Sequence, residues 1–278
     1  MPATGSKPYH PLSLSIRLHA DGFSFFVCDL QTSSLIRGEH FRRTDSLPLA
    51  DQLLQELSRP DYFNRQIDQC FVLICTSSTH VPLEEFRRDE ASALYAFTFA
   101  NQPMSQLRVA YNILPQLESA ELYAIPLDVE EAILQFYPTA RFFASRSILM
   151  ERLLSCDEDH RKRHEEKRLY AVAEAEGYSL FSFKEHRLYF ANTFFVNNPA
   201  NALYFLLNTW QMLQFDALND HLVLVAPQSG RDEQLHQSLA QYLLHVKLLQ
   251  PTDLFPRVPL AREKQVPLDL MALLLNRI

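Results

Sequence analysis

Apolar and polar residues alternate along two separate stretches of the chain, and each stretch turns back at an acidic residue followed by glycine. The stretches and turns are residues 14–20, Asp21-Gly22 and 23–28, and again residues 169–175, Glu176-Gly177 and 178–183. Alternation with a period of two predicts β-strands, and glycine supplies the positive φ of a hairpin turn. The pattern therefore predicts two β-hairpins of the same construction.

Each hairpin begins a series of elements, and the two series have the same order and lie 155 residues apart along the chain. Each is followed by a third strand, a helix, a short apolar strand and a further helix. We expect the third strands over 34–43 and 187–196, the first helices from near Ser46 and from the N-cap Asn198, and the apolar strands over 71–75 and 222–226. Pro199 suits the first position of a helix. The repeated order predicts an internal duplication.

The remaining elements make the first copy longer than the second. Residues 92–120 read as a strand-rich insertion, with strands over 95–100 and 107–111, after a helix that begins near Pro82. Further elements are expected as a strand over 121–125, a helix opened by a capping box of Asp128 and Glu131, a strand over 141–144, and helices over 145–154, over 235–245 and from Pro267. We predict an N-terminal half over 1–155, a charged linker over 156–168 and a C-terminal half over 169–278.

Three antiparallel strands followed by helix-connected apolar strands predict an α/β fold with mixed sheets. The 47% hydrophobic content suits a packed core, and the net charge of −7 argues against a nucleic-acid partner. No apolar run is long enough to span a membrane, and the N-terminus lacks the pattern of a secretory signal. The four cysteines have no C-x-x-C spacing, so we expect reduced thiols in a cytoplasmic protein.

The order of elements resembles that of the actin-like ATPases, whose halves each have a ribonuclease H-like core. The chain as a whole resembles a bacterial family of unknown function with this fold, over residues 14–154 and 168–278. Active actin-like ATPases use an acidic-glycine turn in each half to hold phosphates and Mg²⁺ through water, and a glycine turn to contact adenine. The resemblance implies these nucleotide-cleft candidates: Asp21, Gly22, Ser24, Glu176, Gly177, Ser179, Ser229 and Gly230.

The chain departs from the pattern of the active members, because it has only five glycines and none lie close together. Phe23, Phe25 and Tyr178 stand near the turns, where active members have small residues. We expect these aromatic rings to occupy the space of the phosphates. The first hypothesis is therefore a degenerate actin-like scaffold without nucleotide hydrolysis, catalytic residues, metal or cofactor. The second is a divergent Mg-ATP-binding enzyme or switch, and the third is a metal-dependent nuclease that uses Glu174 and Glu176.

Three further groups have both a functional and an ordinary interpretation. Cys156, His160 and His164 would share one face of a helix and suit zinc, but no fourth ligand is placed and we favour a solvated charged linker. The polar run 76–80 follows a buried strand, and we expect its hydroxyls to cap the next helix, since no acidic residue is near in sequence to support a Ser-His nucleophile.

The helix over 201–215 has apolar residues outside its core-facing stripe, namely Phe205, Met212 and Phe215. A helix that is apolar on more than one face is buried on more than one face. These residues predict contact either with another part of the chain or with a second protein, which would be an unknown partner or a second copy in a homodimer.

Overall fold

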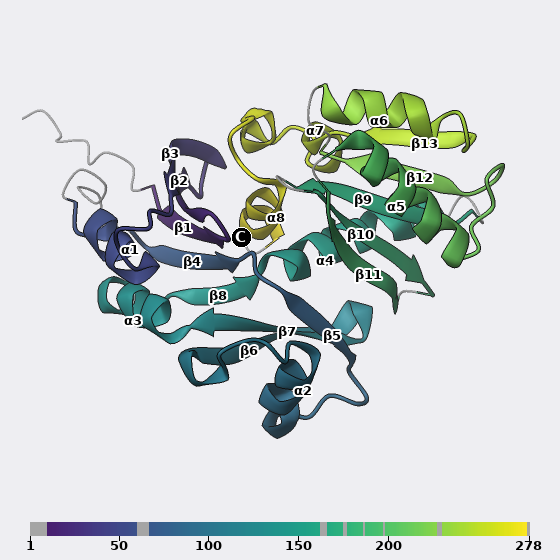
Figure 1. The fold of residues 1–278 in the computed structure, drawn as a ribbon. Coiled ribbons are helices and arrows are strands. Elements are labelled where there is room, and N and C mark those ends of the chain that lie inside the picture. Colours follow the sequence, from purple (N-terminus) through teal and green to yellow (C-terminus); the bar gives the residue numbers. More distant parts are fainter. Residues whose placement is uncertain are drawn as a thin grey trace, which may run out of the picture. The chain divides into compact units, whose positions relative to one another are not determined.

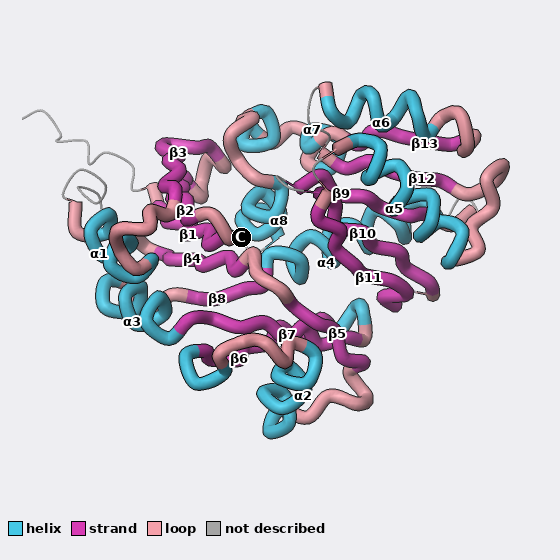
Figure 2. Tube along the Cα trace, in the orientation of Figure 1, coloured by secondary structure: helices cyan, strands magenta, loops and turns pink. Residues whose placement is uncertain are grey.

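The computed structural model describes residues 10–59, 67–161, 166–174, 177–185, 187–196, 198–226 and 230–276. The chain forms two compact units, which are described separately (Figures 1 and 2). The first unit contains Met1–Ile113, Ala120–Ile148 and Val258–Ile278, and the second contains Leu114–Ser119 and Leu149–Arg257. Val258–Ile278 thus packs with the first unit, although we expected the whole of 169–278 to form one half.

The first unit is built on a five-stranded mixed sheet with the order β3-β2-β1-β4-β8. Its strands are β1 (Leu12–His19), β2 (Gly22–Asp29), β3 (Ser34–Arg42), β4 (Gln69–Ile74) and β8 (Arg141–Ala144). β1, β2 and β3 pair antiparallel, whereas β4 pairs parallel with β1 and β8 pairs parallel with β4. The predicted first hairpin and its third strand are therefore present.

The core of the first unit lies on one face of this sheet. The alternate residues Leu12, Leu14, Ile16 and Leu18 of β1 pack there with Phe23 and Phe25 of β2. Helices α1 (Leu49–Leu57) and α3 (Leu127–Phe136) complete the same core. Strand alternation turns Ser13, Ser15, Arg17 and His19 to the opposite face. The first unit also contains α8 (Leu268–Asn276), which contributes Asp269 to a contact with Arg17.

A second, three-stranded sheet has the order β5-β7-β6 and includes part of the predicted insertion over 92–120. Its strands are β5 (Ser78–Pro82), β6 (Leu107–Leu114) and β7 (Ser119–Pro126), with the short 3₁₀ turns η1 (Arg88–Glu90), η2 (Met104–Gln106) and η3 (Pro115–Leu117) between them. The predicted strands over 107–111 and 121–125 are present. The helix expected from near Pro82 is wrong, because the chain is strand β5 there.

The predicted strand over 95–100 is also wrong, because α2 (Ala91–Thr98) occupies most of it. Tyr95, Phe97 and Phe99 alternate as in a strand, but Ala91 and Tyr95 are the buried residues, with helical spacing. Tyr95 and Phe99 pack ring against ring with centroids 4.6 Å apart. The predicted capping box at α3 is likewise wrong, since Pro126 occupies the N-cap and makes no side-chain cap.

The second unit is built on a five-stranded sheet with the order β11-β10-β9-β12-β13. Its strands are β9 (Arg168–Glu174), β10 (Gly177–Lys184), β11 (Arg187–Phe195), β12 (His221–Val225) and β13 (His245–Leu249). β9, β10 and β11 pair antiparallel, and β12 and β13 join in parallel. The positions and directions match those of the first sheet strand for strand, as a duplication requires.

Helices α5 (Pro199–Met212) and α6 (Arg231–Leu239) share a core with one face of the second sheet. The side chain of Asn198 accepts a hydrogen bond from the backbone N–H of Asn201 at 2.8 Å, so the predicted N-cap of α5 is confirmed. α6 ends at Leu239, well before the end of the helix predicted over 235–245, because the chain turns there and enters β13. Two short helical segments follow, α7 (Pro251–Leu254) in the second unit and η4 (Pro259–Arg262) in the first.

α4 (Ser145–Arg161) begins in the first unit and runs into the second. We expected this helix to end at Leu154, with a charged linker from 156. The described chain is still helical at Arg161, so the first part of the predicted linker belongs to the helix.

Candidate functional site

The two hairpin turns contain glycine because the third strand lies against them. Gly22 has φ of +149°, and a Cβ added there would lie 2.0 Å from the carbonyl oxygen of Phe41. Gly177 has φ of +152°, and its Cβ would lie 1.9 Å from the carbonyl oxygen of Phe194. No residue with a side chain fits either position without moving the backbone. The architecture of the sheets therefore explains both glycines without any ligand.

The aromatic residues beside the turns lie in the cores. Phe23 and Phe25 are buried against Phe41 in the first unit, with ring centroids 5.0 Å and 5.3 Å from that ring. Tyr178 is buried in the core of the second unit. Strand alternation places Ser24 and Ser179 on the opposite faces of their sheets. The expectation that these rings fill a phosphate space is therefore wrong, since they point into the cores.

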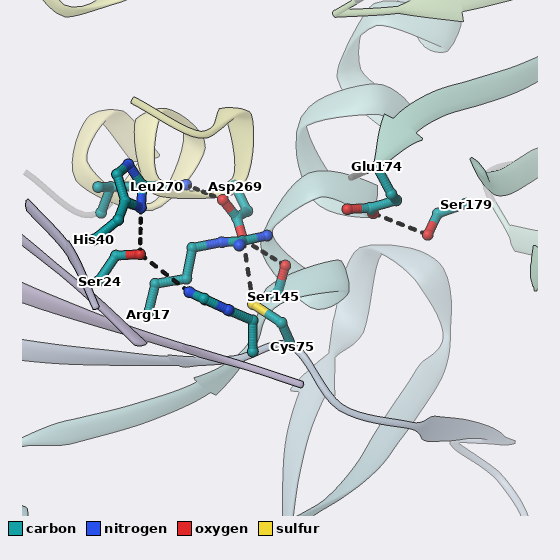
Figure 3. Close-up of polar contacts among 10 residues, drawn as sticks. Arg17, Ser24, His40, Cys75, Ser145, Glu174, Ser179, Asp269 and Leu270 are labelled. Atoms are coloured by element: carbon teal, nitrogen blue, oxygen red, sulfur yellow. Dashed lines mark hydrogen bonds and ion pairs between the residues drawn. The ribbon is translucent and has the colours of Figure 1, made fainter. Parts of the chain in front are cut away.

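At the first hairpin a chain of four polar side chains runs across β1, β2 and β3. His19 donates from Nδ1 to Asp21 Oδ1 at 2.5 Å, because an ionised carboxylate can only accept. His19 Nε2 lies 3.1 Å from Ser24 Oγ, and Ser24 Oγ lies 2.7 Å from His40 Nδ1 (Figure 3 shows the contact between Ser24 and His40). Ser24 is thus held between two imidazole rings.

The protonation of this chain follows from its contacts. The hydrogen bond from His19 lowers the pKa of Asp21, so this carboxylate is ionised at neutral pH. Partial burial lowers the pKa of His40, and the neighbouring His19 and Arg17 act in the same direction. His40 is therefore neutral at neutral pH, and one of its ring nitrogens can accept a hydrogen bond.

The order Asp21, His19, Ser24 is the order of contacts in a serine hydrolase triad, but the hydroxyl is not available for that chemistry. Ser24 is only 1% exposed, and its hydroxyl already contacts both His19 and His40. A nucleophile needs one base on its proton and an open path to its substrate. We interpret the chain as an internally satisfied polar network.

A second polar group in the first unit is centred on the buried carboxylate of Asp269, which is 2% exposed (Figure 3). Asp269 Oδ2 accepts hydrogen bonds from Arg17 Nε at 2.8 Å and Ser145 Oγ at 2.6 Å, and Cys75 Sγ lies 3.8 Å away. Its Oδ1 accepts from the backbone N–H of Leu270. The carboxylate is therefore saturated and joins α8 to β1 and to the start of α4.

At the second hairpin the equivalent serine makes the equivalent two contacts. Ser179 Oγ donates to Glu174 Oε1 at 3.0 Å and lies 3.1 Å from Thr193 Oγ1 (Figure 3 shows the contact with Glu174). Glu174, which we considered as a nuclease carboxylate, thus accepts from a neighbouring strand. Glu176 and Ser229 lie outside the described residues, so their contribution to a site stays a prediction.

Gly230 is the N-cap of α6 and has φ of +84°, with no atom within 4 Å of an added Cβ. The next two residues form a compact polar group with β9 and β10. Arg231 donates to Asp232 at 3.0 Å and to the carbonyl of Glu174 at 3.1 Å, and the hydroxyl of Tyr178 donates to the buried Asp232. Burial of the Tyr178 ring raises its pKa. The residues around Gly230 are thus bonded to one another.

Residues 8–246 match the family described as "Protein of unknown function (DUF3822)". The chain belongs to this family. No curated protein matches the sequence. Among solved structures, a protein from Bacteroides thetaiotaomicron with an actin-like ATPase fold and unknown function is 24% identical, with a TM-score of 0.78 and 96% of each chain covered. The PilM-PilN type IV pilus biogenesis complex is 11% identical, with a TM-score of 0.58 and coverage of 96% and 98%.

These likenesses confirm the predicted fold and the predicted family of this DUF3822 member. It has the mixed α/β architecture of the actin-like ATPases, with ribonuclease H-like halves. Within the described residues, no helix is long and apolar enough to cross a membrane. The internal duplication stays a prediction, although the two sheets share one strand order.

The polar run 76–80 has an acidic partner that is distant in sequence. Ser78 of β5 donates to Glu121 of β7 at 2.5 Å, and Ser147 of α4 donates to the other carboxylate oxygen. His80 Nε2 lies 3.9 Å from Glu121, and burial lowers the pKa of this histidine. The predicted capping role of the Ser78 hydroxyl is therefore wrong, because Ser78 is in a strand and binds a fully buried carboxylate.

The predicted zinc-binding set is only partly described. Cys156 lies on α4 and is partly buried, whereas the side chain of His160 and the whole of His164 lie outside the described residues. No three histidine, cysteine, aspartate or glutamate side chains in the described ranges are grouped to hold a metal ion. The zinc hypothesis gains no support from the structure.

The predicted interaction residues lie in three different environments, and Phe215 follows the end of α5 at Met212. Met212 is 70% exposed, as expected of a contact surface. Phe205 is half-buried and stacks on Phe194, with ring centroids 4.9 Å apart. Phe215 is only 8% exposed and packs on Trp210 within the core. The prediction that Phe215 belongs to an interaction surface is therefore wrong. The structure adds Tyr204 of α5, whose side chain is exposed.

Proposed function

We propose that this protein is a protein-interaction module with an actin-like fold that does not hydrolyse nucleotide. The observation that carries the proposal is the state of the two hairpins. Beside each glycine turn, the polar side chains are bonded to one another, through Ser24 in the first unit and through Ser179 in the second. Phosphate binding requires donors that are free to turn toward the ligand.

The hairpins already use part of the polar groups that a nucleotide would need. One oxygen of the Asp21 carboxylate, Oδ1, accepts a hydrogen bond from His19. The glycines of the turns give no extra backbone room, because the third strands occupy the space beside them. Both facts support a function in binding other proteins rather than nucleotide. One solved structure of similar fold is a complex, the PilM-PilN type IV pilus biogenesis complex, which supports a role in binding other proteins.

The exposed side chains of α5 support a partner surface on the second unit. Tyr204 and Met212 are 64% and 70% exposed, and they lie eight residues apart on the same face of the helix. Asn208 lies between them and donates to the sulfur of Met212 at 3.6 Å. Large apolar side chains grouped on an exposed face favour a protein partner, which would be a second copy or another protein.

Mg-ATP titration tests the first half of the proposal. We expect no heat of binding in calorimetry and no rise in melting temperature with about 5 mM Mg-ATP or Mg-ADP, whereas a bound nucleotide would stabilise the folded chain by RT ln(1 + [L]/Kd). Asp21→Ala serves as the matched variant. A rise in melting temperature that is present in the wild type and absent in Asp21→Ala would contradict the proposal.

Substitution of the exposed face tests the second half. A partner is first purified together with the wild-type chain, and its binding is then measured with purified components. Met212→Lys and Tyr204→Lys should abolish this binding. If the partner is a second copy, they should abolish self-association measured by light scattering. Gln234→Lys, on the exposed side of α6, is the control and should leave binding unchanged. Equal binding by all three variants would exclude α5 as the interaction surface.

The alternative function is a divergent Mg-ATP switch, which two observations favour. Asp21 is 76% exposed and ionised, and Gly230 has open space beside it. The nucleotide titration distinguishes the two functions. The nuclease hypothesis has no such support, because Glu174 is bonded to Ser179 and no metal-type carboxylate cluster occurs in the described part of the chain.

A further inference from the structure

The far end of the second sheet, away from its hairpin turn, has a row of basic side chains. Arg168, His221 and His245 occupy directly paired positions at the starts of the three neighbouring parallel strands β9, β12 and β13. Lys247 follows two residues later on β13, so it lies on the same face as His245. Four basic side chains thus lie together on one face, at the opposite end of β9 from Glu174.

The histidines of this row are in direct contact. The rings of His221 and His245 stack with centroids 4.7 Å apart and an interplanar angle of 17°. Burial lowers the pKa of His221 to about 4, and Lys247, His245 and Arg168 act in the same direction. Burial and Arg168 also lower the pKa of Lys247. Burial is the main cause of both pKa shifts, and the neighbouring basic groups add to it.

Three carboxylates lie near the row, and two of them accept hydrogen bonds from groups outside it. Glu166 is close enough to favour the charged forms of His221 and Lys247. Asp157 of α4 accepts from the Tyr170 hydroxyl, which also accepts from Arg168 at 3.3 Å. Asp220 accepts from the backbone N–H groups of Lys167 and Asp216. Within the described chain neither Arg168 nor Lys247 forms a direct ion pair, and Arg168 Nε is buried without a hydrogen-bond partner.

We propose that Arg168, His221, His245 and Lys247 form a binding site for a phosphate group. A guanidinium, an ammonium and two imidazoles on adjacent strands offer several donors to one tetrahedral anion, and an anion would offset the charge that they share. The site lies at the other end of the sheet from the nucleotide candidates. It is independent of the proposed interaction function, because neither Tyr204 nor Met212 belongs to it.

The probe is inorganic phosphate, added to the full chain at pH 6 and at constant ionic strength. The readout is the imidazole proton resonances of His221 and His245, assigned with His221→Asn and His245→Asn variants. We expect saturable shifts of both resonances and a rise of about one unit in the pKa of His221, which is a tenfold preference of phosphate for the protonated ring. Methyl phosphate is titrated in parallel, and tighter binding of either compound shows whether the natural source is free phosphate or a phosphate ester.

The exposed Lys247 allows a variant that retains the core. Lys247→Gln should weaken phosphate binding at least tenfold, and Arg168→Gln should do the same. Lys184→Gln removes an exposed lysine of β10 at the same end of the sheet but on the opposite face from Arg168, because its neighbour Phe183 packs on Tyr170. This variant is the matched control and should bind phosphate like the wild type. Chloride or acetate shifts equal to those of phosphate, shifts that do not saturate, or full binding by Lys247→Gln would each overturn the proposal.

Discussion

The two hairpins have the same backbone and differ in what surrounds the serine at the same position. In the first, Ser24 lies between two histidines, and in the second, Ser179 lies between Glu174 and Thr193. The residue paired with the serine also differs, being Arg17 in the first sheet and Val172 in the second. The backbone and the serine bridge are thus common to both units, whereas the charge beside them is not.

The difference has a structural cause in the first unit. Arg17 is bonded to Asp269, so the polar face of the first sheet is tied to α8. Val172 can make no such bond, and the second sheet is tied to α6 at its hairpin end by Arg231, which donates to the carbonyl of Glu174. The comparison indicates that a different polar contact joins sheet and helix in each unit, although the strand order is shared.

The largest effect on stability is expected from removing the contact between Arg17 and Asp269 in the first unit. Asp269→Ala leaves the guanidinium of Arg17 without its buried partner and should lower the free energy of unfolding by about 3–5 kcal/mol. Urea unfolding followed by circular dichroism measures it. The double variant Arg17→Val with Asp269→Leu gives the first sheet the residue of the second and should recover most of the loss. A loss below about 1 kcal/mol in Asp269→Ala would show that the pair contributes little.

The next effect tests whether the two turns are equivalent. Gly22→Ala and Gly177→Ala should each cost about 2–3 kcal/mol, because both place a Cβ against a carbonyl oxygen at a positive φ. Trp210 is the single tryptophan and lies in the core of the second unit, so its fluorescence should report the loss in Gly177→Ala directly. Gly230→Ala is the control, with open space and a cost of about 1 kcal/mol.

The third effect is a pH dependence of stability that we expect from His221 of the second unit. The pKa of His221 is about 4 in the folded chain, whereas an unfolded histidine binds its proton near 6.5. The unfolded state therefore gains a proton first as the pH falls, and stability declines between pH 6.5 and 4, by about 3 kcal/mol. His221→Phe, which keeps the ring, should flatten the decline measured by Trp210 fluorescence. An unchanged decline would place its cause elsewhere, for example at His40, whose pKa is also lowered.

The smallest effect tests the serine bridges themselves. Ser24→Ala leaves two ring nitrogens without their shared partner and should cost about 1–2 kcal/mol, whereas Ser179→Ala should cost about 1 kcal/mol. Urea unfolding of both variants gives the comparison, with Ser92→Ala on the exposed side of α2 as the control. Equal losses for the two variants would mean that histidine and carboxylate partners are interchangeable here.

Local pattern was sufficient to predict the hairpins, the Asn198 cap and the order of strands. Each of these depends on residues that are neighbours in sequence, so alternation and turn chemistry define them. α2 was missed because Tyr95, Phe97 and Phe99 alternate like a strand while Ala91 and Tyr95 are spaced like a helix. Phe215 was misplaced because only the packed core shows that its ring meets Trp210.

The polar networks could not be predicted for a different reason. The contact between Ser24 and His40 joins β2 to β3 and becomes visible only when their register is known, although the pairing of β1 with β2 already brings His19 near the turn. Arg17 and Asp269 are 252 residues apart, and Ser78 and Glu121 are 43 apart. No periodicity connects residues at such separations, and only the tertiary fold brings them together.

The bond between Arg17 and Asp269 also has a consequence for the order in which the protein folds during synthesis. The second unit is nearly continuous in sequence, whereas the first requires Val258–Ile278 to complete it. The ribosome therefore finishes all of the second unit before Asp269 is available to the strand made near the beginning. The second unit can therefore complete its contacts before the first, since the first strand of the first unit pairs with a helix made some 250 residues later.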